Sequence, residues 1–149
     1  MPGAAFDGSK TKDSTATDIT YQIWNPWKYP YPCGTPEFPA TCYNGGYDNY
    51  NGTSIVRGTI QASATSVYIN GKAAALMNDR VREEETPQGL PGGAVNIRNA
   101  DGGFGQVTSG NNVQVYCEGK LLAVIGSTAR THANGSTNIA DGSTNVIIG

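Results

Sequence analysis

The sequence predicts an all-β fold, in which a small conical domain is built from three β-hairpins with approximate threefold symmetry. Three observations predict it. The 149 residues include 20 Gly and 8 Pro with almost no helical periodicity, which favours short strands joined by turns. A strand–turn–strand unit occurs twice along the chain. The two ends of the chain are similar to the two halves of a third unit.

The composition fits one domain over residues 1–149. Hydrophobic residues make up 38% of the chain, and no apolar run is long enough to span a membrane. Residues 1–12 lack the apolar stretch of a secretory signal peptide, so we expect none. The net charge is −2 with scattered Lys and Arg, which argues against nucleic-acid binding through a basic face.

The repeated unit runs over residues 62–79 and again over residues 110–127, and the two copies align without a gap. Apolar residues alternate with polar ones before a turn that contains Gly, which predicts a half-buried strand and a tight hairpin. The predicted core positions are Val67, Ile69, Val115, Cys117, Val146 and Ile148, and the predicted turn and hairpin positions are Asn70, Gly71, Lys72, Gly119, Lys120 and Gly149.

The third unit is divided between the chain ends. Residues 142–149 match the first strand of the unit, and residues 4–9 match the second strand. We therefore expect the ends to meet and pair as a third hairpin. The alanines of the second strand, among them Ala75 and Ala123, keep it thin, so that three copies can approach a common axis.

Residues 20–53 contain both Trp and most of the Tyr and Pro of the chain. Repeated Pro argues against a central strand, so this insertion is predicted to be a long ordered loop packed by its own rings. A disulfide between Cys33 and Cys42 would staple it. Two interpretations stay open: the insertion contacts a partner, or it only caps the domain.

The charged segment of residues 79–85 is predicted to be a solvated loop rather than a short helix. The Gly-rich stretch of residues 102–105 leads into a strand, so it lacks the helix N-terminus that a phosphate site needs. No pattern places a base beside a nucleophile. We therefore expect no enzymatic activity and no small-molecule substrate.

The unit resembles the PAAR repeat. The chain opens with MPGAAFDGS and ends with GSTNVIIG, which look like the opening and the terminus of that family, and the resemblance covers about half of the chain. The residues of the first full unit that match the family pattern are Ser63, Val67, Asn70, Gly71, Lys72, Ala74, Ala75 and Asp79.

The resemblance implies a spike-tip protein of a contractile injection machine, such as a phage tail or a type VI secretion-like system. The implied partner is a trimeric β-helical spike protein, with one tip for each trimer. The tip sharpens the spike, and its contact with the target membrane is transient. The implied location is a virion tail tip or an extracellular contractile particle, assembled in the bacterial cytoplasm.

PAAR proteins hold a metal near the apex with three His and one Cys, whereas this chain has a single His, His132. Cys117 aligns with core positions. We therefore expect no cofactor, and propose that the residue 20–53 insertion replaces the metal as a staple of the apex or wraps the cone. The alternative is a metal such as Zn or Fe held by His132 with Cys33 and Cys42.

Two other functions compete with a structural tip. A secreted binding module would use the Trp/Tyr-rich insertion, with Trp24 and Trp27, to bind envelope glycans. An effector enzyme carried on the tip is disfavoured, because the chain ends at GSTNVIIG with no further domain.

Overall fold

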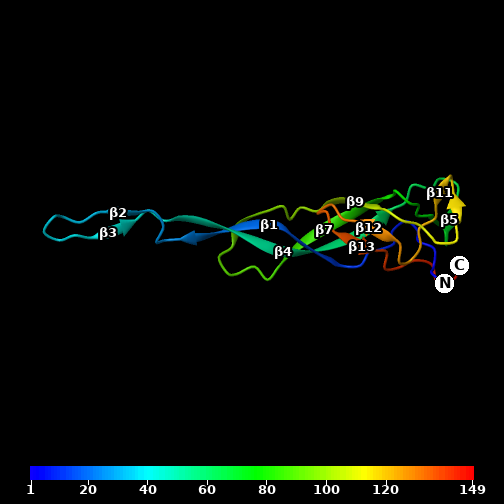
Figure 1. The fold of residues 1–149 in the computed structure, drawn as a ribbon, viewed down its shortest axis with the longest axis horizontal. Coiled ribbons are helices and arrows are strands. Elements are labelled where there is room, and N and C mark those ends of the chain that lie inside the picture. Colours follow the sequence, from blue (N-terminus) through cyan, green and yellow to red (C-terminus); the bar gives the residue numbers. More distant parts are fainter.

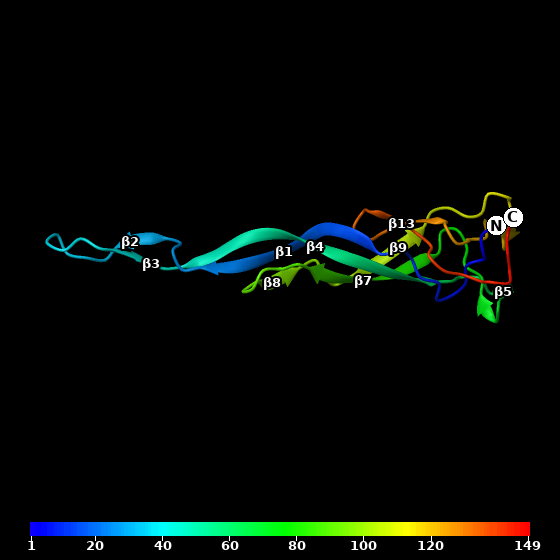
Figure 2. The same ribbon diagram turned by 90° about the horizontal axis from the view of Figure 1, so that it is seen from below.

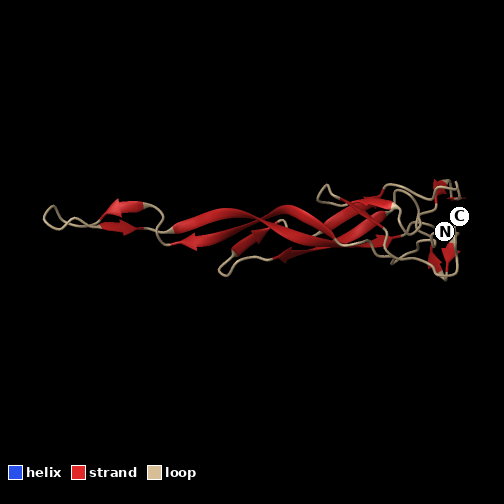
Figure 3. Cartoon of the chain, turned by 60° about the horizontal axis from the view of Figure 1, so that its bottom comes forward, coloured by secondary structure: helices blue, strands red, loops and turns tan.

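The fold consists of strands and turns, and the prediction of an all-β class is confirmed (Figure 3). The computed structural model describes all 149 residues. No helix is present that is long and apolar enough to cross a membrane. The strands are β1 (Ser14–Asn25), β2 (Pro30–Pro32), β3 (Thr41–Tyr43), β4 (Gly46–Gln61), β5 (Tyr68–Ile69), β6 (Lys72–Ala73), β7 (Arg80–Gln88), β8 (Val95–Arg98), β9 (Gly103–Val107), β10 (Tyr116–Cys117), β11 (Lys120–Leu121), β12 (Thr128–Arg130) and β13 (Ser136–Asn138).

Seven strands form one curled antiparallel sheet in the order β13-β12-β9-β7-β4-β1-β8. Near the chain termini, residues 10–12 lie between its two sides. The N–H of Thr11 donates to the carbonyl of Gly58 in β4 at 3.0 Å, and the N–H of Lys12 donates to the carbonyl of Asn138 in β13 at 2.8 Å. The sheet is therefore closed at this end, and the small hairpins β5-β6 and β10-β11 lie beyond it (Figure 1).

The prediction of a loop over residues 20–53 is wrong. β1 and β4 pair in register from Ile19↔Gly52 to Asn25↔Gly46, and β2 and β3 continue as a second hairpin. Together they form a two-stranded ribbon that projects from the end of the molecule that lies opposite the chain termini (Figures 1 and 2). The insertion therefore does not wrap the body, and its outer half pairs only with itself.

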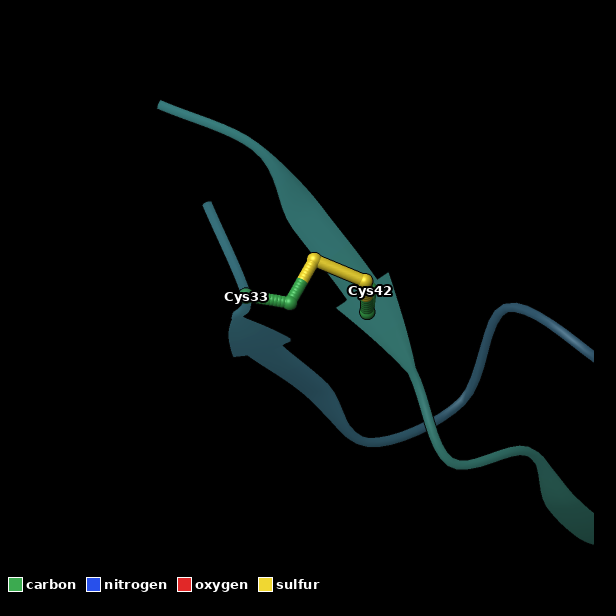
Figure 4. The surroundings of a disulfide bond; sticks show 2 residues. All are labelled: Cys33 and Cys42. Atoms are coloured by element: carbon green, nitrogen blue, oxygen red, sulfur yellow. A yellow bond between two sulfur atoms is a disulfide. The ribbon is translucent and has the colours of Figure 1, made fainter. Parts of the chain in front are cut away.

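The prolines fit this ribbon because a two-stranded hairpin is all edge. Asn44 N–H donates to the Tyr29 carbonyl, and Cys33 N–H donates to the Ala40 carbonyl, both at 3.2 Å. Residues 29 and 33 thus face the partner strand, while Pro30 and Pro32 occupy alternate positions that need no inward N–H. A disulfide joins Cys33 to Cys42 across this hairpin, with their Cα atoms 5.7 Å apart (Figure 4).

The prediction for residues 79–85 is also wrong, because Arg80–Gln88 form strand β7 between β4 and β9. Side chains of this strand alternate strictly: Val81, Glu83 and Glu85 are buried, and the residues between them are exposed. The run of charges concealed a period of two, which is the pattern of a strand with one buried face.

The body has two small cores made largely of Ala and β-branched or Leu side chains. The first lies inside the closed part of the sheet and contains Ala5, Ile60, Ala75, Val81, Val107, Ala123, Ala129 and Ile139. The second lies toward the small hairpins and contains Ala4, Ala64, Ile69, Ala74, Leu76 and Leu122. The abundant alanines allow the backbone segments to approach closely, so the cores are thin.

Candidate functional site

Three buried alanines form a closed ring of backbone hydrogen bonds at the centre of the body. Ala5 N–H donates to the Ala123 carbonyl at 2.9 Å, Ala123 N–H to the Ala75 carbonyl at 2.9 Å, and Ala75 N–H to the Ala5 carbonyl at 3.0 Å. All three residues have no exposed surface. A cyclic donor–acceptor pattern requires three segments in equivalent orientations, so the backbone has local threefold order here.

A turn after each alanine segment repeats the same polar contact. The side chains of Ser9, Asp79 and Ser127 accept the N–H of the residue three positions earlier, at 3.0, 2.7 and 3.0 Å. Each of these side chains is buried. A buried N–H without an acceptor is costly, so these three side chains fix the geometry of the turns.

The hairpins that precede the alanine segments are held by a third equivalent contact. Ala74 N–H donates to the Val67 carbonyl at 3.0 Å, and Leu122 N–H donates to the Val115 carbonyl at 2.9 Å. The corresponding bond at the chain ends joins Ala4 N–H to the Val146 carbonyl at 2.9 Å. The two termini therefore lie side by side (Figure 1).

The turn residues singled out in the sequence lie at the tips of these hairpins. Asn70 and Gly71 have φ of 51° and 79°, and Glu118 and Gly119 have φ of 53° and 81°. Two successive positive φ values define a type I′ turn, which suits the twist of a short hairpin. The Lys72 ammonium lies 5.0 Å from the centre of the Phe6 ring, Lys120 is exposed, and Gly149 lies beside Met1.

The predicted core residues of the hairpins form an apolar end of the molecule. Ile69 is buried, whereas Val67, Val115, Cys117, Val146 and Ile148 are half-buried around the second core. Tyr68, Tyr116 and Ile147 alternate with these residues and are 60%, 59% and 44% exposed. We call this end, which comprises the hairpins β5-β6 and β10-β11 and the paired chain ends, the base.

Cys117 takes part in the base as an apolar side chain. It is a free cysteine, and desolvation, with a smaller contribution from the charge of Glu118, raises the pKa of its thiol. A raised pKa reduces the thiolate fraction at neutral pH, so Cys117 is a poor nucleophile and a poor metal ligand.

His132 makes an arrangement that the sequence did not predict. Its Nδ1 lies 3.1 Å from Glu83 Oε1 and its Nε2 lies 3.0 Å from Glu85 Oε2. Both carboxylates are buried, Glu85 also accepts the Ser54 hydroxyl, and the His132 N–H donates to Glu83 at 2.6 Å. Burial lowers the pKa of His132, but the hydrogen bonds that its ring donates to Glu85 and Glu83 outweigh this effect, so its pKa is raised.

The Gly-rich strand β9 makes room for this cluster. A Cβ at Gly103 would lie 3.0 Å from His132 Cβ, and one at Gly105 would lie 2.7 Å from Glu83 Oε1 and closer still to the Arg130 carbonyl oxygen. These close approaches explain the glycines without a phosphate site. The alternation along Arg80–Gln88 is the sequence signal that could have identified the buried glutamates.

The alternative metal site of His132 with Cys33 and Cys42 is wrong. The two cysteines form a disulfide on the projecting ribbon, whereas His132 lies in the turn between β12 and β13. These two strands belong to the body and lie far from β2 and β3 (Figure 1). Both ring nitrogens of His132 already face carboxylates. No group of three or more His, Cys, Asp or Glu is arranged to hold a metal ion, so the residues present do not fit the PAAR metal.

The projecting ribbon carries most of the aromatic side chains on its surface. Trp24 and Trp27 are 51% and 71% exposed. They contact Tyr47 and Tyr43 across the ribbon in edge-to-face pairs with ring centroids 5.1 and 5.2 Å apart. These cross-strand pairs, with the disulfide, stiffen a ribbon that has no second layer.

Comparisons with protein-family models, with curated proteins and with solved structures found no match for this chain.

Proposed function

We propose that this chain is a PAAR-like structural tip that caps a trimeric β-helical spike and sharpens it for penetration of a target cell envelope. The observation that carries the proposal is the closed ring of hydrogen bonds among Ala5, Ala75 and Ala123. One chain with three equivalent segments around an axis matches a partner of three identical chains. A cap without threefold order would not match such a partner.

The base supplies the surface for such a partner. Its outward side chains Tyr68, Tyr116 and Ile147 follow the same position of the three hairpins and are exposed. Half-buried Val67, Val115 and Val146 lie between them and the second core. Apolar side chains and the free edges of short strands are the elements that associate with the end of another β structure.

Unequal connections between the three alanine segments taper the other end. The connection through β12 and β13 covers residues 128–138, that through β7 to β9 covers residues 80–107, and that through β1 to β4 covers residues 10–61. Residues from β4, β7, β9 and β12 meet in the first core. Further along the molecule β8 pairs with β1 only as far as Gln22, and beyond that point the ribbon continues alone. Axial force on the base would be concentrated on this narrowing end (Figure 2).

The mechanism is mechanical and requires no chemical step. Axial load from sheath contraction would pass from the spike to the base, and from there through the hydrogen-bonded strands to the ribbon. In this proposal the protein assembles in the bacterial cytoplasm, belongs to a virion tail or an extracellular contractile particle, and touches the target membrane only transiently.

Native mass spectrometry after co-expression with the trimeric β-helical protein encoded beside it tests the proposal. We expect one copy of this chain for each trimer. Val67→Asp at the base should abolish the complex, because it places a charge in an apolar contact. Phe38→Asp on the outer hairpin, where Phe38 is 77% exposed, is the matched control and should leave the complex intact. A folded monomer that ignores the trimer would refute the proposal.

A further inference from the structure

A polar groove lies on the ribbon where β8 pairs with β1. Strand β8 is well away from the base (Figure 2). The volume of the groove is about 330 Å³, and its walls come from β1, β4 and β8. The groove combines amide side chains with a guanidinium. These side chains belong to Gln22, Asn49, Asn51, Asn96 and Arg98.

Three of the amides form a ladder across the three strands. Asn96 Nδ2 donates to Gln22 Oε1 at 2.8 Å, and Gln22 Nε2 donates to Asn49 Oδ1 at 2.8 Å. This chain of bonds fixes the planes of the amides before any ligand arrives. Pre-ordered polar groups lose less conformational entropy on binding than mobile ones do.

A bulge in β8 directs Asn96 toward this ladder. The pairing with β1 steps from Thr20↔Arg98 to Gln22↔Val95, which leaves one extra residue on β8. Asn96 has a φ of 52°, in the left-handed region. Bulges change the direction of a side chain, and Asn accepts this backbone conformation better than most residues.

Several groups in the groove keep their hydrogen-bonding capacity free. The amide nitrogen of Asn49, the whole side chain of Asn51 and the guanidinium of Arg98 make no hydrogen bond or ion pair within the chain. Amides offer donors and acceptors in one plane, and the guanidinium adds further donors. Trp24 and Tyr47, 51% and 44% exposed, lie two residues from Gln22 and Asn49 on the same face of β1 and β4, and they add exposed aromatic rings beside the amides.

We propose that this groove binds a glycan chain. Neutral planar amides beside aromatic rings match a ligand that carries many hydroxyl groups and apolar ring faces. The walls are too polar for an acyl chain, and Arg98 is the only charged side chain among them, which is too little positive charge for nucleic acid. The groove lies on the flank of the ribbon, where a spike tip would meet envelope polysaccharide.

The experiment measures binding of the full chain to three defined hexasaccharides, made of glucose, N-acetylglucosamine or galacturonate, by titration calorimetry. We expect at least one to bind with a Kd at or below about 1 mM, the range of a weak specific complex. Asn51→Ala should weaken binding by about tenfold without loss of stability, because the Asn51 side chain makes no hydrogen bond within the chain. Asn49→Ala is the second variant, and it should also weaken saccharide binding. Asn112→Ala, an exposed amide elsewhere, should bind as the parent does.

Binding of galacturonate alone, lost in Arg98→Ala, would also support the proposal and would identify an acidic glycan. Absence of binding to all three saccharides would overturn it. So would binding by Asn51→Ala and Asn49→Ala that is as tight as that of the parent protein. So would attachment to phosphatidylglycerol vesicles without saccharide binding, since that is the behaviour of a lipid-binding surface. The groove is remote from the base, so any of these results leaves the complex with the spike trimer as a separate question.

Discussion

His132 Nε2 lies 3.0 Å from Glu85 Oε2, and its other ring nitrogen lies 3.1 Å from Glu83 Oε1. Two buried carboxylates on β7 thus share one imidazole from the β12–β13 turn. Since each nitrogen must carry a proton to donate, the cluster is complete when the ring is protonated. This arrangement joins two of the three connections of the body and makes its stability depend on pH.

We expect the free energy of unfolding to fall as the pH rises above the ordinary pKa of histidine. The pKa of His132 is raised in the folded protein, because hydrogen bonds to Glu85 and Glu83 outweigh the effect of burial. The stabilisation is therefore complete below the unfolded pKa of about 6.5, and is lost as the pH rises through the higher folded pKa. Urea unfolding between about pH 5.5 and pH 9 measures it.

His132→Gln is the control for this pH dependence, because Gln can still donate to one glutamate but does not titrate. The variant should lose the decrease in stability over the same pH window. If the parent protein and His132→Gln respond to pH alike, another group is responsible and the role assigned to His132 is wrong.

Ala75→Val tests the alanine ring. Ala75 is fully buried and hydrogen-bonded on both sides within the ring, so two added methyl groups must displace neighbouring backbone. We expect a loss of about 1–3 kcal/mol in the free energy of unfolding, measured by denaturant titration. Ala140→Val is the matched control, since Ala140 is exposed, and should change stability by less than about 0.5 kcal/mol. Equal effects at both positions would contradict a close-packed ring.

Gly71→Ala tests the hairpin turns at the base. Gly71 has a φ of 79°, and an added Cβ would have no atom within 4 Å, so the cost comes from backbone strain alone. We expect the free energy of unfolding to fall by about 1–2 kcal/mol, which is the usual cost of a left-handed conformation for a residue with a Cβ. Gly92 is the control, because it has open space around it and no positive φ. The melting temperature of Gly92→Ala should equal or exceed that of the parent protein. A turn that tolerates Ala at residue 71 would show that it can relax to another type.

Reduction of the Cys33–Cys42 disulfide should loosen the outer hairpin and leave the body unchanged. The bond closes a loop with a sequence separation of 9, and this loop pairs only with itself. A glutamate-specific endopeptidase should cleave after exposed Glu37 faster in the Cys33→Ser/Cys42→Ser variant. Its global unfolding free energy should differ from that of the parent by less than about 0.5 kcal/mol. A large drop in global stability would mean that the ribbon supports the body after all.

Replacement of residues 26–45 by an Asn-Gly turn tests the idea that the insertion staples the apex. The outer hairpin contributes no residue to either core, so the shortened protein should melt within a few degrees of the parent. Calorimetry measures the difference. A melting temperature lowered by about 10 °C or more would instead support the hypothesis that the insertion stabilises the apex.

Local sequence signals were enough to predict the all-β class and to locate the hairpin turns. Alternation of Val67 and Ile69 with polar neighbours, and the Asn70-Gly71 pair, are such signals, because strand period and turn chemistry act between adjacent residues. A link between Cys33 and Cys42 could also be read from their spacing, and the structure joins them.

The course of the insertion and the role of the charged segment depend instead on tertiary structure. Pro30 and Pro32 argue against a strand only where a second neighbour needs their N–H, and a free ribbon has no such neighbour. Glu83 and Glu85 are buried because β9 and the turn after β12 bring His132 to them across 47 to 49 residues of sequence. Contacts at that separation depend on how the sheet curls, so no local pattern of charge or periodicity could specify them.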